Sequence, residues 1–218
     1  MGRRRMGIDE AGRGCVLGDL FVAAYVTEAD DDALRAAGAA DSKAVSAKRR
    51  EAARSALAAL GTASVQRISP RAIDAGNLNA LEEEAIVALI VDLRPDEVWL
   101  DALGPPKALP ALTARLQAAL RPMGIDVPIH GEPKADARFP VVGAASMFAK
   151  VGRDEALAEA DAVWGPLGSG YPSDPVTRTW LTERLASPAP LPPIVRTRWG
   201  TLDALRALHG RGPTTGIG

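Results

Sequence analysis

The segment GIDEAGRG, Gly7–Gly14, places two adjacent carboxylates between a short apolar lead and a glycine-rich turn. The stretches Arg3–Asp9 and Leu20–Thr27 are expected to be strands joined through that turn. A strand that ends on Asp9 and Glu10 presents acidic side chains at its carboxyl end, where crevices form in open α/β sheets. The segment therefore predicts the first strand of a sheet and the location of a functional site.

The remaining chain alternates strands with helices and then becomes helical. Further strands are expected at Ala63–Ser69, Glu97–Asp101 and Val127–His130. Helices are expected from a cap at Ser46 through KRREAARSALAAL (48–60), and at Asn77–Leu93, Lys107–Leu120, Pro140–Val163, Asp174–Leu185 and Leu202–His209. This order predicts an α/β core with a mixed sheet over residues 1–160 and a C-terminal helical lobe over residues 161–218.

Composition predicts a globular protein of the cytoplasm. Hydrophobic residues make up 47% of the 218 residues, which is ample for a core, and the single cysteine, Cys15, excludes an internal disulfide. The longest apolar run, Leu20–Val26, is far shorter than the ~20 residues needed to cross a bilayer, so no membrane association is expected.

The formal net charge of −1 argues against coating nucleic acid by bulk electrostatics, so such binding would need local basic clusters. The candidate clusters are Lys48 with Arg49 and Arg50, Lys134 with Arg138, Lys150 and Arg153, and Arg196 with Arg198. Taken one by one, such clusters are more often solvated helix faces than binding patches.

Four acids stand out as candidate metal ligands: Asp9, Glu10, Asp101 and Asp136. If the strands ending on Asp9 and Asp101 are parallel neighbours, about 4.8 Å apart, their carboxylates can share a cation. Oxygen ligands without histidine or cysteine favour Mg²⁺ or Mn²⁺, and a pair of such ions is common in phosphodiester hydrolysis. The alternative is that these acids only cap helices or face solvent in turns.

Five ordered segments resemble the type 2 ribonuclease H (ribonuclease HII) family, in its archaeal and eukaryotic branch. The segments are GIDEAGRGCVLGDL (7–20), DSK (41–43), EVWLDALG (97–104), KADARFPVVGAASMFAKVGRD (134–154) and GSGYPSDPVTRTWL (168–181). The resemblance implies a ribonuclease H-like mixed five-stranded sheet flanked by helices, with a C-terminal helical region that helps to bind substrate. It also implies an endonuclease that cuts the RNA strand of RNA/DNA hybrids and cuts at single ribonucleotides in duplex DNA, leaving 5′-phosphate and 3′-hydroxyl ends.

The resemblance assigns roles to individual residues. Asp9, Glu10, Asp101 and Asp136 would hold two Mg²⁺ or Mn²⁺ ions at the scissile phosphate. The backbone of Gly12, Arg13 and Gly14 would read the 2′-hydroxyl. Further substrate contacts would come from Ser42, Lys43, Ser146, Lys150 and Tyr171. We expect Val141, Val142, Met147, Phe148, Trp99 and Trp180 to serve packing.

The chain departs from the family pattern where Cys15 and Asp19 replace the usual prolines. This loosens the entrance to the second strand and places another acid near the metal site. Two other functions stay open on the residues alone: a metal-dependent phosphatase acting on a small phosphoester, and a catalytically silent hybrid-binding protein. We expect a monomer and predict no accessory subunit, although the sequence leaves open whether one binds. The tail GRGPTTGIG lacks a sliding-clamp motif, so clamp binding is not predicted.

Overall fold

The structure is a computed structural model that describes residues 2–39, 47–101 and 106–210. Its strands are β1 (Arg5–Ala11), β2 (Leu20–Thr27), β3 (Gly61–Ile68), β4 (Glu97–Asp101) and β5 (Ile129–Glu132). Its helices are α1 (Asp31–Ala36), α2 (Ala47–Ala58), α3 (Pro70–Ala75), α4 (Leu78–Leu93), α5 (Leu109–Leu120), α6 (Ala135–Arg138), α7 (Pro140–Trp164), α8 (Pro175–Ala186) and α9 (Gly200–Gly210). Short 3-10 helices at Pro106–Ala108 and Arg121–Met123 flank α5.

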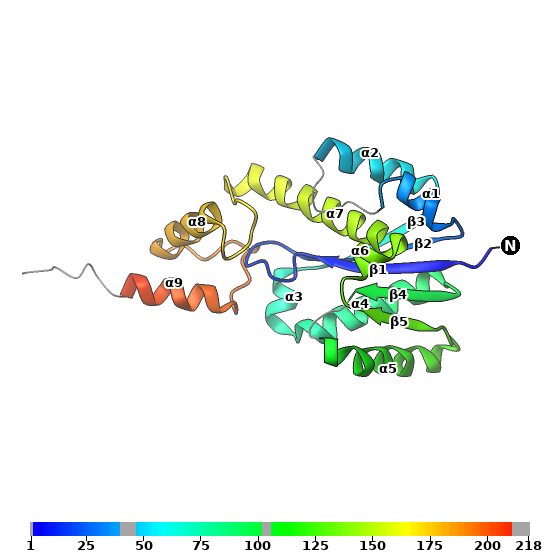
Figure 1. Cartoon of the computed structure of the whole chain (residues 1–218). Coiled ribbons are helices and arrows are strands. Elements are labelled where there is room, and N and C mark those ends of the chain that lie inside the picture. The colour runs from blue at the N-terminus through cyan, green and yellow to red at the C-terminus, as the bar shows by residue number, and fades with distance from the viewer. Residues whose placement is uncertain (1, 40–46, 102–105, 211–218) are drawn as a thin grey trace, which may run out of the picture.

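The strands form one mixed sheet in the order β3-β2-β1-β4-β5 (Figure 1). β2 is antiparallel to both β1 and β3, whereas β4 is parallel to both β1 and β5. The parallel pair β4 and β5 needs a crossover, which α5 supplies. The predicted class, an α/β fold with a mixed five-stranded sheet and flanking helices, is confirmed.

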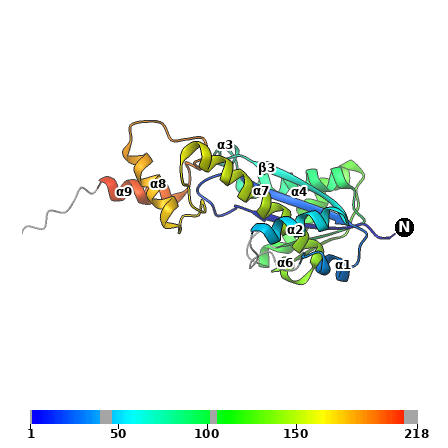
Figure 2. The same ribbon diagram turned by 90° about the horizontal axis from the view of Figure 1, so that it is seen from above.

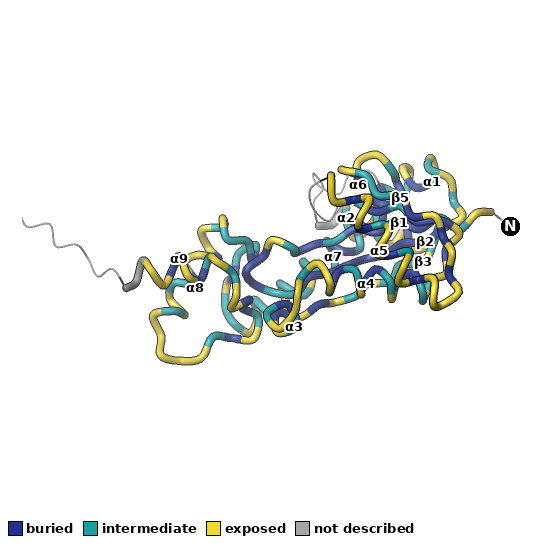
Figure 3. Tube along the Cα trace, turned by 90° about the horizontal axis from the view of Figure 1, so that it is seen from below, coloured by how far each residue is buried: buried dark blue, intermediate teal, exposed yellow. Residues whose placement is uncertain are grey.

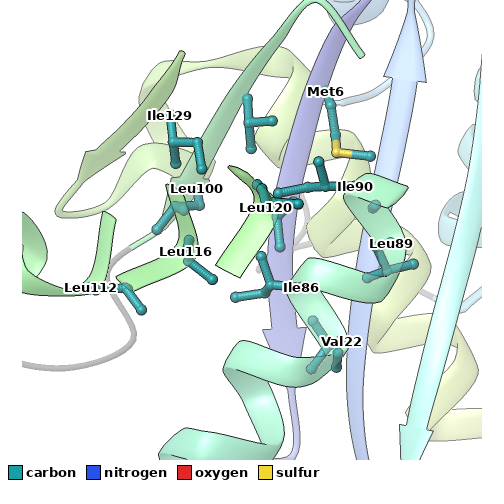
Figure 4. Close-up of a cluster of buried hydrophobic side chains, with 14 of the residues drawn as sticks. Met6, Val22, Ile86, Leu89, Ile90, Leu100, Leu112, Leu116, Leu120 and Ile129 are labelled. Carbon is teal, nitrogen blue, oxygen red and sulfur yellow. The ribbon is translucent and has the colours of Figure 1, made fainter. Parts of the chain in front are cut away.

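Helices cover both faces of the sheet (Figures 1 and 2). The apolar side chains of α4 and α5 pack on one face, where they meet Met6, Val22 and Leu100 of the strands (Figure 4). The helices α1, α2 and α7 lie over the other face. Every residue of β2 is buried, which explains its continuous apolar sequence. Within the described residues, no helix combines the length and apolar character needed to span a membrane.

Close contact between α7 and β1 depends on Gly7. A Cβ atom at this position would lie 2.1 Å from the carbonyl oxygen of Val141, which is closer than atoms can approach. Because Gly7 has no Cβ, the N-terminal half of α7 lies directly against β1. The expected core residues Val141, Val142 and Met147 are buried there, which confirms their packing role.

The C-terminal region extends beyond the sheet and has a core of its own. Leu167, Trp180 and Leu202 are buried together with Val16 and Leu17 from the loop between β1 and β2. The connector between α8 and α9 is largely exposed, as the burial-coloured trace shows (Figure 3). The division expected between residues 160 and 161 stays a prediction, and α7 runs without a break through it.

Several element boundaries differ from the sequence prediction. β1 continues past Asp9 to Ala11, because Glu10 and Ala11 pair with Val22 and Phe21 of β2. The strand β5 begins later than predicted, at Ile129. The helices α1, α3 and α6 were not predicted. Each has six residues or fewer and is short enough to lack a clear apolar period.

Candidate active site

The acids Asp9 and Asp101 come directly after the last residues through which β1 and β4 pair with each other. In the parallel register Ile8 is opposite Leu100, so the next residue of each strand is one of these acids. Neighbouring strands lie about 4.8 Å apart. The predicted parallel arrangement of the two strands is confirmed, and it brings their carboxylates to one edge of the sheet.

Burial and mutual repulsion raise the pKa values of the two acids on β1. Burial raises the pKa of Glu10 to about 8, and the negative charge of Asp9 adds to this shift. Burial also raises the pKa of Asp9 to about 6, against a hydrogen bond from Ser146 and the positive charge of Lys150. The charge of Asp101 raises both values. A bound cation would relieve this repulsion.

The donor atoms fit a hard divalent cation. Glu10 Oε2 is buried and has no hydrogen-bond partner in the described part of the chain. Asp101 Oδ1 accepts a hydrogen bond of 3.2 Å from the amide of Ala135, which ties the end of β4 to α6, and Asp136 is buried in the first turn of that helix. Such oxygen donors suit Mg²⁺ or Mn²⁺. Within the described ranges, no three acidic, histidine or cysteine side chains converge as a complete ligand set. The site thus has suitable donors without a preassembled coordination shell.

Ser146 does not lie on an exposed face of α7, contrary to the expected contact with the substrate backbone. Its side chain is fully buried because α7 lies so close to β1. There it hydrogen-bonds the carboxylate of Asp9 and accepts a hydrogen bond of 2.7 Å from Lys150 Nζ. The buried Ser146 therefore connects Lys150 to Asp9 of the acid cluster by hydrogen bonds.

A cavity of about 320 Å³ joins several predicted site residues. It is lined by Glu10, Ala11, Gly12, Arg13, Gly14, Arg50, Lys150, Arg153, Asp154 and Tyr171. Gly12 has a φ of 92°, a conformation that favours glycine, so the turn requires a glycine at this position. Arg50, Arg153 and Asp154 were not predicted as individual site residues. Ser42 and Lys43 lie outside the described residues.

The side chain of Arg13 contacts α4. It forms an ion pair with Glu82, which is fully buried on α4, and donates a hydrogen bond of 2.5 Å to Asn79 Oδ1. Arg13 thereby fixes the turn to α4, and its positive charge also counteracts the rise in the pKa of Glu10. The sequence pattern could not show this, because Glu82 lies on a helix distant in the chain.

Arg196 corrects the interpretation of the basic cluster that it forms with Arg198 in the sequence. Its side chain is fully buried, so it is not part of a surface patch. Its guanidinium donates hydrogen bonds to backbone carbonyls of the glycine turn and the residues that follow. No local pattern could have indicated this contact, because one acceptor, Gly12, lies 184 positions earlier.

Tyr171 reaches the glycine turn from the loop before α8. Its ring lies against Gly14, where an added Cβ would be 3.5 Å from the ring. The guanidinium of Arg153 lies over the ring, 5.3 Å from its centre, and donates to the carbonyl of Ser169 at 2.6 Å. The hydroxyl of Tyr171 contacts the buried thiol of Cys15, so the replacement of a proline by Cys15 adds a partner for this ring.

Asp19 does not add an unpaired acid to the site, as its position in the sequence suggested. Its carboxylate forms an ion pair with Arg67 on β3. The main causes of the raised pKa values of Asp9 and Glu10 do not include Asp19. Pairing with Arg67 therefore compensates part of the negative charge that Asp19 adds near the site.

The chain matches known proteins over nearly its whole length. The family model of Ribonuclease HII matches residues 6–202. Ribonuclease HII of Archaeoglobus fulgidus is 37% identical over 206 residues, which cover 93% of this chain and 96% of that protein.

Two solved structures share the fold. The ribonuclease H2 of Pyrococcus horikoshii OT3 has a TM-score of 0.85 and 35% identity, covering 96% of this chain and 100% of that one. The ribonuclease HII of Archaeoglobus fulgidus in complex with PCNA has a TM-score of 0.81 and 35% identity, covering 90% and 95%. This chain therefore belongs to the ribonuclease HII family and is an endoribonuclease of the ribonuclease H class.

Proposed function

We propose that this enzyme hydrolyses the RNA strand of RNA/DNA hybrids and cuts on the 5′ side of single ribonucleotides embedded in duplex DNA. The observation that carries this proposal is the shared cavity of Glu10, the turn Gly12–Gly14 and Tyr171. A carboxylate for phosphate chemistry and a backbone turn able to contact a 2′-hydroxyl thus face one nucleotide-sized space. A phosphatase acting on a small phosphoester would have no use for the turn or the tyrosine.

Asp9, Glu10, Asp101 and Asp136 would hold the divalent metal on which the enzyme depends. Two Mg²⁺ or Mn²⁺ ions bound there would activate the attacking water and stabilise the leaving 3′ oxygen, which gives 5′-phosphate and 3′-hydroxyl ends. The orphaned oxygen of Glu10 and the raised pKa values of Asp9 and Glu10 support this role. Lys150 would help to position the carboxylate of Asp9, because it donates a hydrogen bond to Ser146, which in turn hydrogen-bonds Asp9.

The other chain groups would bind and orient the substrate. The turn Gly12–Gly14 would contact the 2′-hydroxyl, and Tyr171 would pack against the neighbouring sugar. Ser42 and Lys43 would place the phosphate near the cut. The lobe formed by residues 161–218 would help to bind the duplex, since it contributes Tyr171 to the cavity. We expect the enzyme to act as a monomer.

Cleavage of a duplex with one embedded ribonucleotide tests the proposed function. With Mg²⁺ or Mn²⁺ we expect a cut on the 5′ side of the ribonucleotide, and without metal none. An all-DNA duplex of the same sequence is the control. Cutting of the all-DNA duplex, or hydrolysis of only small phosphoesters, would contradict the proposal, and metal-stimulated binding without cutting would favour a silent hybrid-binding protein.

Millimolar Mg²⁺ or Mn²⁺ is expected to raise the melting temperature. The ion binds the assembled acid cluster and relieves the repulsion among Asp9, Glu10 and Asp101, so it stabilises the folded state alone. For a chain of this size each kcal/mol of stabilisation raises the melting temperature by about 2–4 °C. Thermal unfolding with and without metal, at an ionic strength equalised with KCl, measures the effect. A melting temperature equal in both buffers argues against metal binding by these acids.

Asp19→Asn is expected to leave the metal concentration for half-maximal rate within about twofold of the wild-type value, because Asp19 is paired with Arg67. A metal titration of the cleavage rate measures this, with Asp19→Pro as the variant that restores the usual family residue. A shift of about tenfold in Asp19→Asn would show that its charge reaches the metal site after all.

A further inference from the structure

The turn Gly12–Gly14 is held from below by one buried arginine of the C-terminal segment. The guanidinium of Arg196 donates from Nη2 to the Gly12 carbonyl at 2.7 Å, from Nη1 to the Arg13 carbonyl at 3.0 Å and from Nε to the Gly18 carbonyl at 2.9 Å. The side chain is fully buried. Three donors of one planar group therefore set the orientation of three peptide units.

The backbone of Arg196 is itself fixed by the surrounding chain. Its amide donates to the Val16 carbonyl at 2.9 Å, and the amide of Gly18 donates to the Ile194 carbonyl at 2.8 Å. The next residue, Thr197, donates from both its amide and its hydroxyl to Asp74, each at 2.7 Å. The guanidinium is thus placed by the C-terminal segment and does not merely follow the turn.

The direction of the two carbonyls determines the direction of two N–H groups. The Gly12 carbonyl and the Arg13 N–H belong to one peptide unit, as do the Arg13 carbonyl and the Gly14 N–H. In a trans peptide these groups point in opposite directions, and the described chain contains no cis peptide. Because both carbonyls face Arg196, both N–H groups point away from it. Neither N–H donates a hydrogen bond to another group in the described part of the chain, and both residues line the cavity.

The charge of Arg196 acts in the same direction as its geometry. No carboxylate in the described part of the chain lies within ion-pair distance of its guanidinium, so its direct contacts are neutral carbonyls and the ring of Trp199, while Asp19 and Asp74 act on it from further away. A cation at the oxygen end of a peptide unit polarises that unit and strengthens its N–H as a donor. The two N–H groups are therefore better donors to a sugar hydroxyl or phosphate oxygen.

We infer that Arg196 is a positioning residue, which sets the N–H groups of Arg13 and Gly14 as a pair of donors for the ribonucleotide. This inference rests on the proposed function, since it names what sets the sugar-reading turn. It assigns the C-terminal segment a part in recognition that does not require contact with the substrate.

Arg196→Lys tests the inference, with Arg115→Lys as the matched control. Lysine keeps the charge but cannot span three carbonyls, whereas Arg115 is an exposed residue of α5 that donates to Glu83 and does not contact the turn. We expect Arg196→Lys to lower kcat/KM on a single embedded ribonucleotide by about a hundredfold, and the control to stay within about twofold. We also expect the ratio of kcat/KM for a 2′-hydroxyl substrate to kcat/KM for a 2′-fluoro substrate to fall by about tenfold. Free guanidinium should restore part of the activity of Arg196→Ala, and ethylammonium should not.

Amide hydrogen exchange gives a readout that does not depend on cleavage. Peptides covering residues 12–18 should exchange at least about tenfold faster in Arg196→Lys than in the wild type, while peptides of β2 and α4 stay unchanged. Unaltered exchange together with kcat/KM within about threefold of the wild type would overturn the inference. A loss of activity with unchanged sugar preference, or exchange that rises throughout the protein, would also overturn it, because Arg196 would then serve only stability. If the wild type itself does not cut, the proposed function fails, and the exchange of residues 12–18 still decides whether Arg196 sets the turn.

Discussion

Asp101→Asn is expected to lower the rate of cleavage in Mg²⁺ by at least about a hundredfold while leaving the fold intact. Asp101 is the last residue of β4 and comes directly after the point where the pairing of β4 with β1 ends, beside Asp9. Asparagine has the same shape, and its oxygen can still accept the hydrogen bond from the Ala135 amide. The substitution removes the negative charge that a cation would need between the carboxyl ends of β1 and β4.

The thermal stability of the same variant separates loss of metal binding from loss of structure. The charge of Asp101 raises the pKa values of Asp9 and Glu10, so its removal relieves repulsion, and we expect no fall in melting temperature without metal. The increase in melting temperature that Mg²⁺ produces should be smaller in Asp101→Asn than in the wild type. Asp126→Asn, the same change at an exposed position before β5, is the control and should behave as the wild type. Activity above about a tenth of the wild-type rate in Asp101→Asn would refute the assignment of this acid.

The sequence was sufficient to predict that the candidate acids lie close together, because the main determinants of their placement are local. The acids near the carboxyl ends of two strands and the turn from Gly12 follow from short patterns, and the parallel pairing of β1 with β4 brings Asp9 and Asp101 together. The lengths of β1 and β5 were less predictable, since pairing with neighbouring strands decides where a strand ends.

The directions of long side chains could not be predicted, because they depend on packing between distant segments. Ser146 was expected at the surface, yet Gly7 lets α7 approach β1 and buries it. Arg13 and Arg196 are basic residues suited to a substrate surface, but each has acceptors in another part of the chain. The side chains that hold the turn therefore became visible only in three dimensions, whereas the turn itself was evident from its glycines.

Tyr171→Ala is expected to reduce cleavage at a single embedded ribonucleotide about tenfold more than cleavage of a uniform RNA/DNA hybrid. Tyr171 lines the cavity beside Gly14, and Arg153 lies over its ring. In the proposed role a deoxyribose would lie flat against this ring and a 2′-hydroxyl would crowd it, so the ring would favour a junction from RNA to DNA. Loss of an aromatic stacking contact of ~1–3 kcal/mol corresponds to about fivefold to more than a hundredfold in rate. A uniform hybrid offers many phosphates and depends less on this one contact.

Tyr171→Phe distinguishes the ring from the hydroxyl. Phenylalanine keeps the surface against which a sugar packs and loses the contact with the Cys15 thiol. If junction reading belongs to the ring, Tyr171→Phe keeps the wild-type ratio of rates on the two substrates, even if both rates fall slightly. Measuring kcat/KM for both variants on both substrates, together with their melting temperatures, gives the answer. Equal losses on the two substrates in Tyr171→Ala, at an unchanged melting temperature, would make Tyr171 a general substrate contact. Selectivity lost equally in the alanine and phenylalanine variants would instead assign junction reading to the hydroxyl and its partner Cys15.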